Sequence, residues 1–278
     1  MIGMSPTIVS VGHFMLRWYG LFFMLGIASG VWLGLREARR KGFDPELLES
    51  FVIWAVVGGM VGARVFHVVD RWDLYAADPL RAVAIWEGGL AVYGGMVGGV
   101  LAGVVFAMQH KLAVWKLADA AAPGMILGQA VGRLACIPNG DAYGAPTHVP
   151  WAFIYTNPES MVPRELLGVP LHPYPVYELL FDLMVLGLLW RLRGVFKIDG
   201  LLFLTYVGVY AVGRFLLTYF RIEQIWFWGL QEAQVVALLA LAGAVLLLVW
   251  RLRTGPGGFN SRPAARQRPA RFSTGPGR

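Results

Sequence analysis

Residues 233–250 read AQVVALLALAGAVLLLVW, a stretch without a single charged residue. A helix needs about 20 apolar residues to cross the hydrocarbon core of a bilayer, so this stretch predicts a transmembrane helix. The chain is 57% hydrophobic and only 15% charged, whereas soluble domains carry about a quarter charged residues. The sequence therefore predicts an all-α membrane protein of about seven transmembrane helices. The other six apolar segments are residues 14–35, 50–69, 89–108, 117–137, 175–191 and 200–220.

The charged residues predict the orientation of these helices. The net charge is +7, and most of the basic residues lie in alternate connections and in the tail. The remaining connections are acidic, and the one between the second and third apolar segments contains Asp70, Asp73, Asp78 and Glu87. Basic loops stay in the cytoplasm, so we expect the N-terminus outside and the C-terminus in the cytoplasm. This distribution assigns the positive charge to membrane topology, and no nucleic acid is expected as a partner.

Two segments lie outside the apolar pattern. The outer connection from Pro138 to Pro173 is rich in proline and aromatic residues, which predicts a small head region or a substrate platform over 138–173, with an aromatic belt that anchors the protein as an equal alternative. Within it, residues 151–155 predict a short strand or an interfacial helix. Residues 1–253 form the predicted transmembrane domain. The basic tail, 254–278, is rich in Gly, Pro and Arg and is expected to be disordered.

Three arginines lie within or beside apolar segments, namely Arg64, Arg133 and Arg214. An arginine at mid-membrane costs at least about 2.5–3.5 kcal/mol, so such residues usually face a protein interior, a cavity or an anionic ligand. The guanidinium fork suits a phosphate. The alternative is that each side chain reaches up to the outer head groups. The glycines of residues 88–99 likewise allow either close helix packing or space for a ligand beside Tyr93.

Six blocks along the chain resemble the prolipoprotein diacylglyceryl transferases of bacterial inner membranes. Residues 132–144, GRLACIPNGDAYG, are similar to the family signature Gly-Arg-x-x-Asn-x-x-Asn-Gly-Glu-x-x-Gly. The blocks follow the order of the family, and the resemblance covers most of the chain, from the first predicted span to the seventh. The remaining five are Arg17–Gly20, Gly62–Arg64, Gly88–Gly95, His172–Glu178 and Tyr210–Arg221.

The resemblance implies an enzyme, a multi-pass transferase whose active site faces the outer leaflet of the bacterial inner membrane. Its partners would be phosphatidylglycerol and a prolipoprotein whose lipobox cysteine follows the signal sequence. The diacylglyceryl group would pass to the cysteine thiol as a thioether, with release of glycerol phosphate, as the first step of lipoprotein maturation. No cofactor and no metal are expected, and the single cysteine excludes a Cys-rich metal site.

The resemblance also implies the site residues. Arg133 and Arg214 are expected to stabilise charge on the phosphate oxygens, with Arg64 behind them. The attacking thiol must lose its proton, so a base is expected nearby. The predicted catalytic residues are Arg133, Arg214, Asp141 and Tyr93. The predicted substrate-binding residues are Tyr19, Arg64, Asn139, Gly144, His172, Glu178 and Tyr210.

Four positions depart from the family pattern. Tyr93 stands where many members carry histidine, and Cys136, Asp141 and Thr218 stand where the family has asparagine, glutamate and glutamate. A phenol is a poor base at neutral pH, so Asp141 becomes the better candidate. These departures support an alternative, a divergent relative that binds phospholipid but uses another acceptor or is inactive. A transporter is disfavoured because no internal repeat and no chain of mid-membrane carboxylates are evident.

Overall fold

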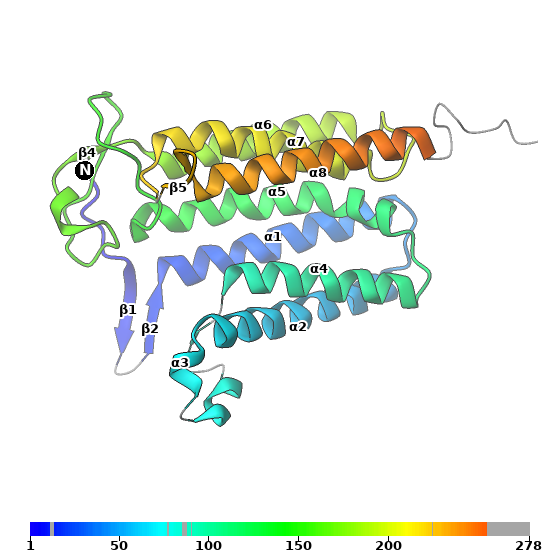
Figure 1. The fold of residues 1–278 in the computed structure, drawn as a ribbon, viewed down its shortest axis with the longest axis horizontal. Coiled ribbons are helices and arrows are strands. Elements are labelled where there is room, and N and C mark those ends of the chain that lie inside the picture. Colours follow the sequence, from blue (N-terminus) through cyan, green and yellow to red (C-terminus); the bar gives the residue numbers. More distant parts are fainter. Residues whose placement is uncertain (12–13, 77, 85–87, 90, 224, 255–278) are drawn as a thin grey trace, which may run out of the picture.

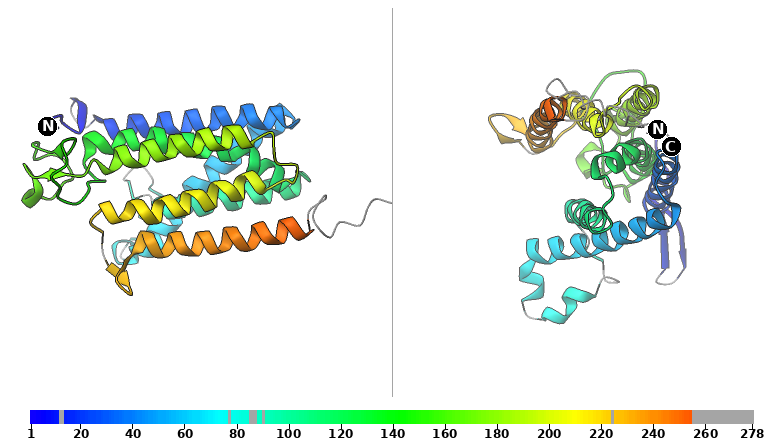
Figure 2. Two further views of the ribbon diagram at one scale, coloured as in Figure 1. Left: turned by 90° about the horizontal axis from the view of Figure 1, so that it is seen from above. Right: turned by 90° about the vertical axis from the view of Figure 1, so that its right-hand side faces the viewer.

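The computed structural model describes residues 1–254 except 12–13, 77, 85–87, 90 and 224. Most of its long helices run side by side along one axis, and α2 (Pro45–Asp70) is inclined to them (Figures 1 and 2). Each of the seven predicted apolar segments falls on one of these helices. The predicted tail lies, from residue 255 onward, outside the described residues. The long helices are α1 (Trp18–Arg40), α2 (Pro45–Asp70), α4 (Val92–Gln109), α5 (Val114–Asn139), α6 (Tyr174–Leu192), α7 (Leu201–Leu217) and α8 (Glu232–Thr254).

Five of the described helices are long and apolar enough to cross a membrane: α1, α2, α5, α7 together with the turn that follows it, and α8. Helix α4 is apolar but shorter, and α6 carries Glu178, Asp182 and Arg191. The outward faces of the bundle expose large apolar side chains such as Val57, Leu101 and Leu246. Such faces have no place in water, so the protein is a multi-pass membrane protein.

Short elements fill the connections. The single-turn helices are α3 (Trp72–Tyr75), η1 (Pro79–Val83), η3 (Arg164–Leu166) and η4 (Thr218–Phe220). Three antiparallel pairs join β1 (Thr7–Val11) to β2 (Phe14–Arg17), β3 (Phe153–Ile154) to β4 (Pro170–Leu171), and β5 (Ile225–Phe227) to β6 (Leu230–Gln231). Of the short strand and the interfacial helix left open for residues 151–155, the structure has the strand, at Phe153–Ile154.

The first predicted span begins too early. Residues 14–17 were expected to be part of the membrane helix, but they pair as β2 with β1, in a register that sets Val11 against Phe14 and Thr7 against Arg17. The pairing satisfies backbone groups that a helix would otherwise have to satisfy. Helix α1 therefore begins only at Trp18.

Helix α5 lies at the centre and packs against α1, α6 and α7, while α8 packs on α7 and α2 packs on α4 (Figures 1 and 2). Glycines allow the closest of these contacts. A Cβ added at Gly26 would lie 2.8 Å from the Gly128 carbonyl oxygen, and one at Gly98 would lie 2.8 Å from the Gly62 Cα. Of the two roles left open for the glycines of the third segment, close helix packing is the one these contacts show, because α4 approaches α2 backbone to backbone.

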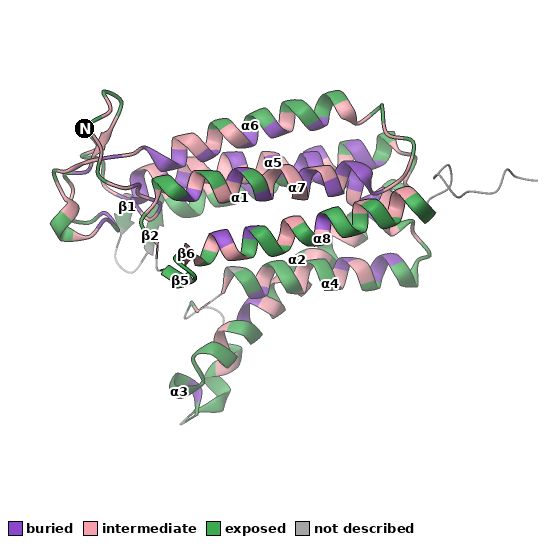
Figure 3. Ribbon diagram, turned by 45° about the horizontal axis from the view of Figure 1, so that its top comes forward, coloured by how far each residue is buried: buried purple, intermediate pink, exposed green. Residues whose placement is uncertain are grey.

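The buried residues follow this arrangement (Figure 3). One core cluster joins Ala122 and Ile126 of α5 to Val185 and Leu189 of α6 and Tyr206 of α7. A second cluster joins α1, α2, α4 and α5 around Leu48 and Leu117. Both clusters include α5, which holds the two sides of the bundle together.

Buried charges hold the helices together at one end of the bundle. Glu37 of α1 is 2.5 Å from Arg193 Nη1 and 2.7 Å from Arg40 Nε. Asp119 of α5 is 3.3 Å from Lys41 Nζ and accepts hydrogen bonds from two backbone N–H groups at the start of α7, those of Gly200 and Phe203. This is the end at which the basic connections α1–α2, α4–α5 and α6–α7 lie (Figure 1).

The opposite end is called the head end here. It carries the N-terminus, the β1–β2 pair, α3, the 140–173 connection and the β5–β6 pair (Figure 1). The 140–173 connection is tied to α5 by Tyr155, which is 1% exposed and whose hydroxyl donates to the Ile137 carbonyl oxygen at 3.1 Å. The head end is therefore built of ordered connections that pack on the ends of the helices.

Candidate functional site

The helices bring charged residues together at the head end. Helices α5 and α7 run toward this end and α6 runs away from it (Figure 1). Arg133 and Arg214 lie near the ends of α5 and α7, and Glu178 lies in the second turn of α6. All three side chains therefore reach the same level of the bundle.

Glu178 is the centre of this group. Arg133 Nε lies 3.0 Å from Glu178 Oε2, a charge–charge contact without the alignment of a hydrogen bond. Arg214 Nη1 donates to Glu178 Oε1. The carboxylate is only 4% exposed, whereas the two arginine side chains are 22% and 19% exposed. One buried carboxylate thus holds two guanidinium groups that still reach open space.

Tyr174 supports the same contact from one turn earlier in α6. Its hydroxyl donates to Glu178 Oε1 at 3.0 Å and accepts from Arg214 Nη1 at 2.6 Å. A charged group taken out of water needs several such partners. The expectation that Glu178 pairs with an arginine across the bundle is confirmed, and the pairing involves both.

A third arginine and a second carboxylate extend the group. Glu223 Oε1 lies 2.7 Å from Arg221 Nη1 and 3.5 Å from Arg214 Nη2. The Tyr174 ring lies below both guanidiniums, with centroid distances of 5.9 Å to Arg214 and 5.4 Å to Arg221. Arg133, Arg214 and Arg221, called the arginine group here, thus alternate with two glutamates.

The predicted base lies just beyond the end of α5. Gly140 ends the helix in the left-handed conformation, with φ of 73°, which turns the chain so that Asp141 faces back toward the last turn. Asp141 Oδ1 accepts from Asn139 Nδ2 at 2.9 Å, and Oδ2 accepts from the Cys136 thiol at 3.6 Å. Cys136 itself is buried against Tyr174.

Gly144 and His172 lie side by side in the head connection. A Cβ added at Gly144 would lie 2.6 Å from the His172 Cβ and 2.8 Å from the Phe220 carbonyl oxygen, so only glycine fits there. Gly144 also forms a β-bridge to Arg221. His172 faces Tyr177, with 3.2 Å between Nδ1 and the tyrosine hydroxyl. Gly144 therefore holds the backbone of Arg221 next to His172.

Tyr93 reaches the arginine group from another helix. A cavity of about 190 Å³ is lined by Tyr93 of α4, Arg214 of α7, Glu223, and Glu232 and Ala233 at the start of α8. Tyr93 and Arg214 thus face one open space, although α4 and α7 are far apart in the sequence. Tyr93 is 58% exposed, which leaves its hydroxyl accessible to a ligand in this cavity.

Two further tyrosines surround the site. Tyr19 of α1 lies close enough to Asp141 and Arg133 to interact with both charges. Tyr210 of α7 lies within the fields of Arg133, Glu178 and Arg214. The structure therefore gathers the sequence-predicted residues around one place, with the exception of Arg64.

Arg64 lies apart from the arginine group and holds a loop. Its N–H groups donate to the five carbonyl oxygens of Arg81, Ala82, Ala84, Gly88 and Gly89, at 2.5–3.2 Å. Its guanidinium also lies 5.2 Å from the centroid of the Tyr75 ring. An arginine has five N–H donors in all, and each of them is directed at the main chain here.

Four residues at the site were not among those selected from the sequence: Tyr174, Asp182, Arg221 and Glu223. Asp182 lies one turn after Glu178, is 1% exposed, and has one carboxyl oxygen without a hydrogen bond among the described residues. The signal for Asp182 was a charge within an apolar segment. Tyr174 and Arg221 lie inside family-like blocks, while Glu223 carries no local signal because its contacts depend on the fold.

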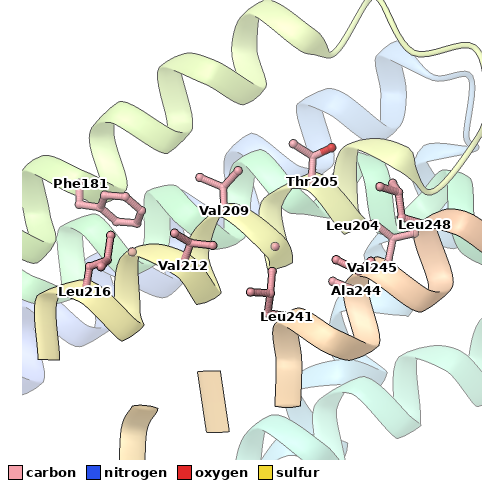
Figure 4. A pocket seen from close by; sticks show the side chains of 12 residues that line it. Phe181, Leu204, Thr205, Val209, Val212, Leu216, Leu241, Ala244, Val245 and Leu248 are labelled. Carbon is pink, nitrogen blue, oxygen red and sulfur yellow. The ribbon is translucent and has the colours of Figure 1, made fainter. Parts of the chain in front are cut away.

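An apolar groove runs beside the site (Figure 4). It has a volume of about 410 Å³ and lies between α7 and α8, with Phe181 of α6 at one end. Gly213 lines this groove, and its neighbour Arg214 lines the polar cavity. Adjacent faces of α7 thus offer one apolar and one cationic surface, an arrangement suited to a ligand with an apolar chain and an anionic group.

Comparison with known proteins agrees with this chemistry. The family model for prolipoprotein diacylglyceryl transferase matches residues 6–250. A phosphatidylglycerol–prolipoprotein diacylglyceryl transferase from Nostoc sp. is 37% identical over 253 residues, which cover 88% of this chain and 89% of the relative. One from Halalkalibacterium halodurans is 33% identical over 270 residues, covering 96% and 93%. One from Bacillus cereus is 34% identical, covering 89% and 92%. The chain belongs to the prolipoprotein diacylglyceryl transferase family.

Proposed function

We propose that this protein transfers the diacylglyceryl group of phosphatidylglycerol to the lipobox cysteine of prolipoproteins. The thiol would become a thioether, and glycerol phosphate would be released. The observation that carries this proposal is the convergence of Arg133 and Arg214 on one buried carboxylate beside an open cavity. The names of the family relatives, which cover most of the chain, support the same reaction.

In this proposal all seven long helices cross the bacterial inner membrane. The N-terminus and the head region face the periplasm, and the basic connections and C-terminus face the cytoplasm. The positive-inside rule supports this orientation, because the basic connections gather at the end opposite the head. The arginine group then lies at the level of the outer leaflet, where the phosphate of a phospholipid is located.

The arginine group would bind the donor. Two guanidiniums at fixed separation would stabilise the charge that develops on a phosphate leaving group. Glu178 would fix the separation of the two guanidiniums, because its carboxylate contacts both of them. Tyr93, which lines the same cavity as Arg214, would orient the phosphate or glycerol oxygens. An acyl chain of the donor would lie in the apolar groove next to Gly213.

Asp141 would act as the base. The thiol of the incoming cysteine gives its proton to the carboxylate, the sulfur attacks the glycerol carbon, and the carbon–oxygen bond to the phosphate breaks with its electron pair left on oxygen. Asn139 orients the carboxylate through its hydrogen bond. Tyr19 and Tyr210 would lie beside the reacting groups. Gly144, packed against His172, would hold the backbone of Arg221 in place.

Arg64 would contribute indirectly. Every donor is used by carbonyl groups of residues 81–84 and 88–89, so Arg64 would hold these residues in place on the approach to α4 and Tyr93. This differs from the direct phosphate contact that the sequence suggested, and it explains why a buried arginine is tolerated there.

The reaction is tested with purified protein in detergent, phosphatidylglycerol and a lipobox peptide. Mass spectrometry measures the diacylglyceryl adduct for the wild type, for Arg133→Ala, and for Arg164→Ala as a matched control on the exposed part of the head. We expect adduct from the wild type and the control and none from Arg133→Ala. Phospholipid binding without any adduct from the wild type would contradict the proposal and support the divergent-relative alternative.

A further inference from the structure

Glu223 differs from Glu178 in how it meets the arginine group. Glu178 is 4% exposed and lies beneath the guanidiniums, whereas Glu223 is 19% exposed and lies at their open side. Its Oε1 contacts Arg221 Nη1 at 2.7 Å and Arg214 Nη2 at 3.5 Å. One carboxylate oxygen thus occupies the space between two guanidiniums, where a phosphate oxygen would fit equally well.

The cavity reaches the arginine group through Glu223. Tyr93, Arg214 and Glu223 line the same space of about 190 Å³. An anion that approaches Arg214 through this cavity therefore meets Glu223 on the Nη2 side of the guanidinium. The Nη1 side is already taken by Tyr174 and Glu178.

The chain around Glu223 favours movement of this carboxylate over movement of Arg221. The Arg221 backbone is held by its bridge to Gly144, and its carbonyl oxygen accepts from Gln231 Nε2 at 3.2 Å. Glu223 lies two residues on, outside any helix or strand, and the arginines are the ion-pair partners it has within the described part of the chain. A rotation of the Glu223 side chain would therefore free it while the Arg221 backbone stays in place.

Thr218 brings no carboxylate to the Arg214 guanidinium. The family resemblance implies a glutamate at this position, one turn after Arg214. Thr218 is fully buried, and its hydroxyl donates to the Arg214 carbonyl oxygen at 2.6 Å, so it offers no charge to the guanidinium. Glu223 supplies that negative charge from the connection that follows α7.

We propose that Glu223 is a positioning residue for the donor phosphate, a carboxylate that bridges Arg214 and Arg221 and yields its place to the phosphate. The inference rests on the proposed function of the arginine group. Glycerol phosphate leaves with more negative charge than the diester that entered, and the returning carboxylate competes with it for the same guanidiniums. Glu223 therefore weakens anion binding and favours product release.

The test compares two variants that each remove one negative charge from the same cavity. Glu223→Gln removes the charge that bridges Arg214 and Arg221. Glu232→Gln removes a charge that has no ion-pair partner among the described residues. The measurements on the purified full chain are KM for phosphatidylglycerol, kcat, and the inhibition constant of added glycerol phosphate. We expect Glu223→Gln to lower KM and the inhibition constant about three- to fivefold, the scale of a partly exposed ion pair, and to lower kcat where release is slow.

Glu232→Gln should change these constants by less than half as much on a logarithmic scale, and Glu223→Asp, which keeps the charge, should retain wild-type inhibition. If both glutamine variants bound glycerol phosphate equally more tightly, the inference would be overturned, because the loss of any negative charge from the cavity would then explain the effect. Weaker anion binding by Glu223→Gln would also overturn it, as would no change. Arg214→Ala separates the two proposals: if it binds phosphatidylglycerol like the wild type, the proposed phosphate site itself fails.

Discussion

Glu178→Gln is the substitution that should most disturb the site while preserving its shape. Glutamine has nearly the volume of glutamate, but it carries no charge and turns one oxygen into a donor. Arg133 and Arg214 would then face each other without their shared carboxylate. Breaking a buried ion pair by removing one partner costs about 3–5 kcal/mol.

The expected loss is smaller here because the arginines are 22% and 19% exposed and water solvates part of their charge. We expect about 2–3 kcal/mol of lost stability. For a protein of this size that corresponds to a fall in melting temperature of roughly 5–10 °C. Transferase activity should fall more steeply than stability, since the guanidiniums lose their fixed separation.

The assay is thermal unfolding in detergent at one fixed scan rate, with Glu165→Gln on the exposed surface of the head as the matched control. The double variant Arg133→Gln/Glu178→Gln should lose about 1 kcal/mol less than the sum of the single losses, because both remove the same contact. A melting temperature unchanged by Glu178→Gln, or strictly additive losses, would refute the reasoning.

Three further predictions concern residues away from the reacting groups. Arg64→Lys replaces five donors by three and should cost about 1–3 kcal/mol, seen as faster hydrogen exchange of residues 81–84 and 88–89; unchanged exchange would contradict this role. Gly98→Val should separate α4 from α2 and lower the melting temperature, whereas Gly243→Ala, with nothing within 4 Å of its added Cβ, should not; equal effects would refute the packing argument. Asp119→Asn loses the Lys41 ion pair and weakens the hydrogen bonds at the start of α7, so thermal unfolding should show a loss of about 1–3 kcal/mol of stability. An unchanged stability would contradict this structural role of Asp119.

The helices were predictable because the bilayer is a demanding solvent. A spanning segment has to satisfy its own backbone groups, so an apolar run of sufficient length has few alternatives to a helix. The seven apolar segments accordingly became the long helices, with boundaries shifted by a few residues. The error at residues 14–17 arose because β1 offers those residues a backbone partner that composition does not reveal.

Much of the site was also visible in the sequence. Arg133 and Arg214 are predictable site residues because charges in apolar segments are energetically costly. Glu178 is predictable because it lies in the family-like block His172–Glu178. Arg64 has the same local pattern, a glycine shortly before an arginine in an apolar segment, yet its surroundings are the carbonyl groups of a loop. The pattern identifies a buried guanidinium but not the group that satisfies it.

The sequence by itself determined the apolar helices, their charge asymmetry and the arginines that lie within apolar segments, since each follows from local composition and the cost of charge in an apolar medium. The tertiary structure decided that Glu178 joins two arginines, that Glu223 joins a third, and that Tyr93 shares a cavity with Arg214. These contacts connect α4, α5, α6 and α7 with the segment before α8. Their partners are set by the helix packing, in which glycine contacts bring α2 close to α4 and α1 close to α5, and spacing along the chain carries no record of that packing.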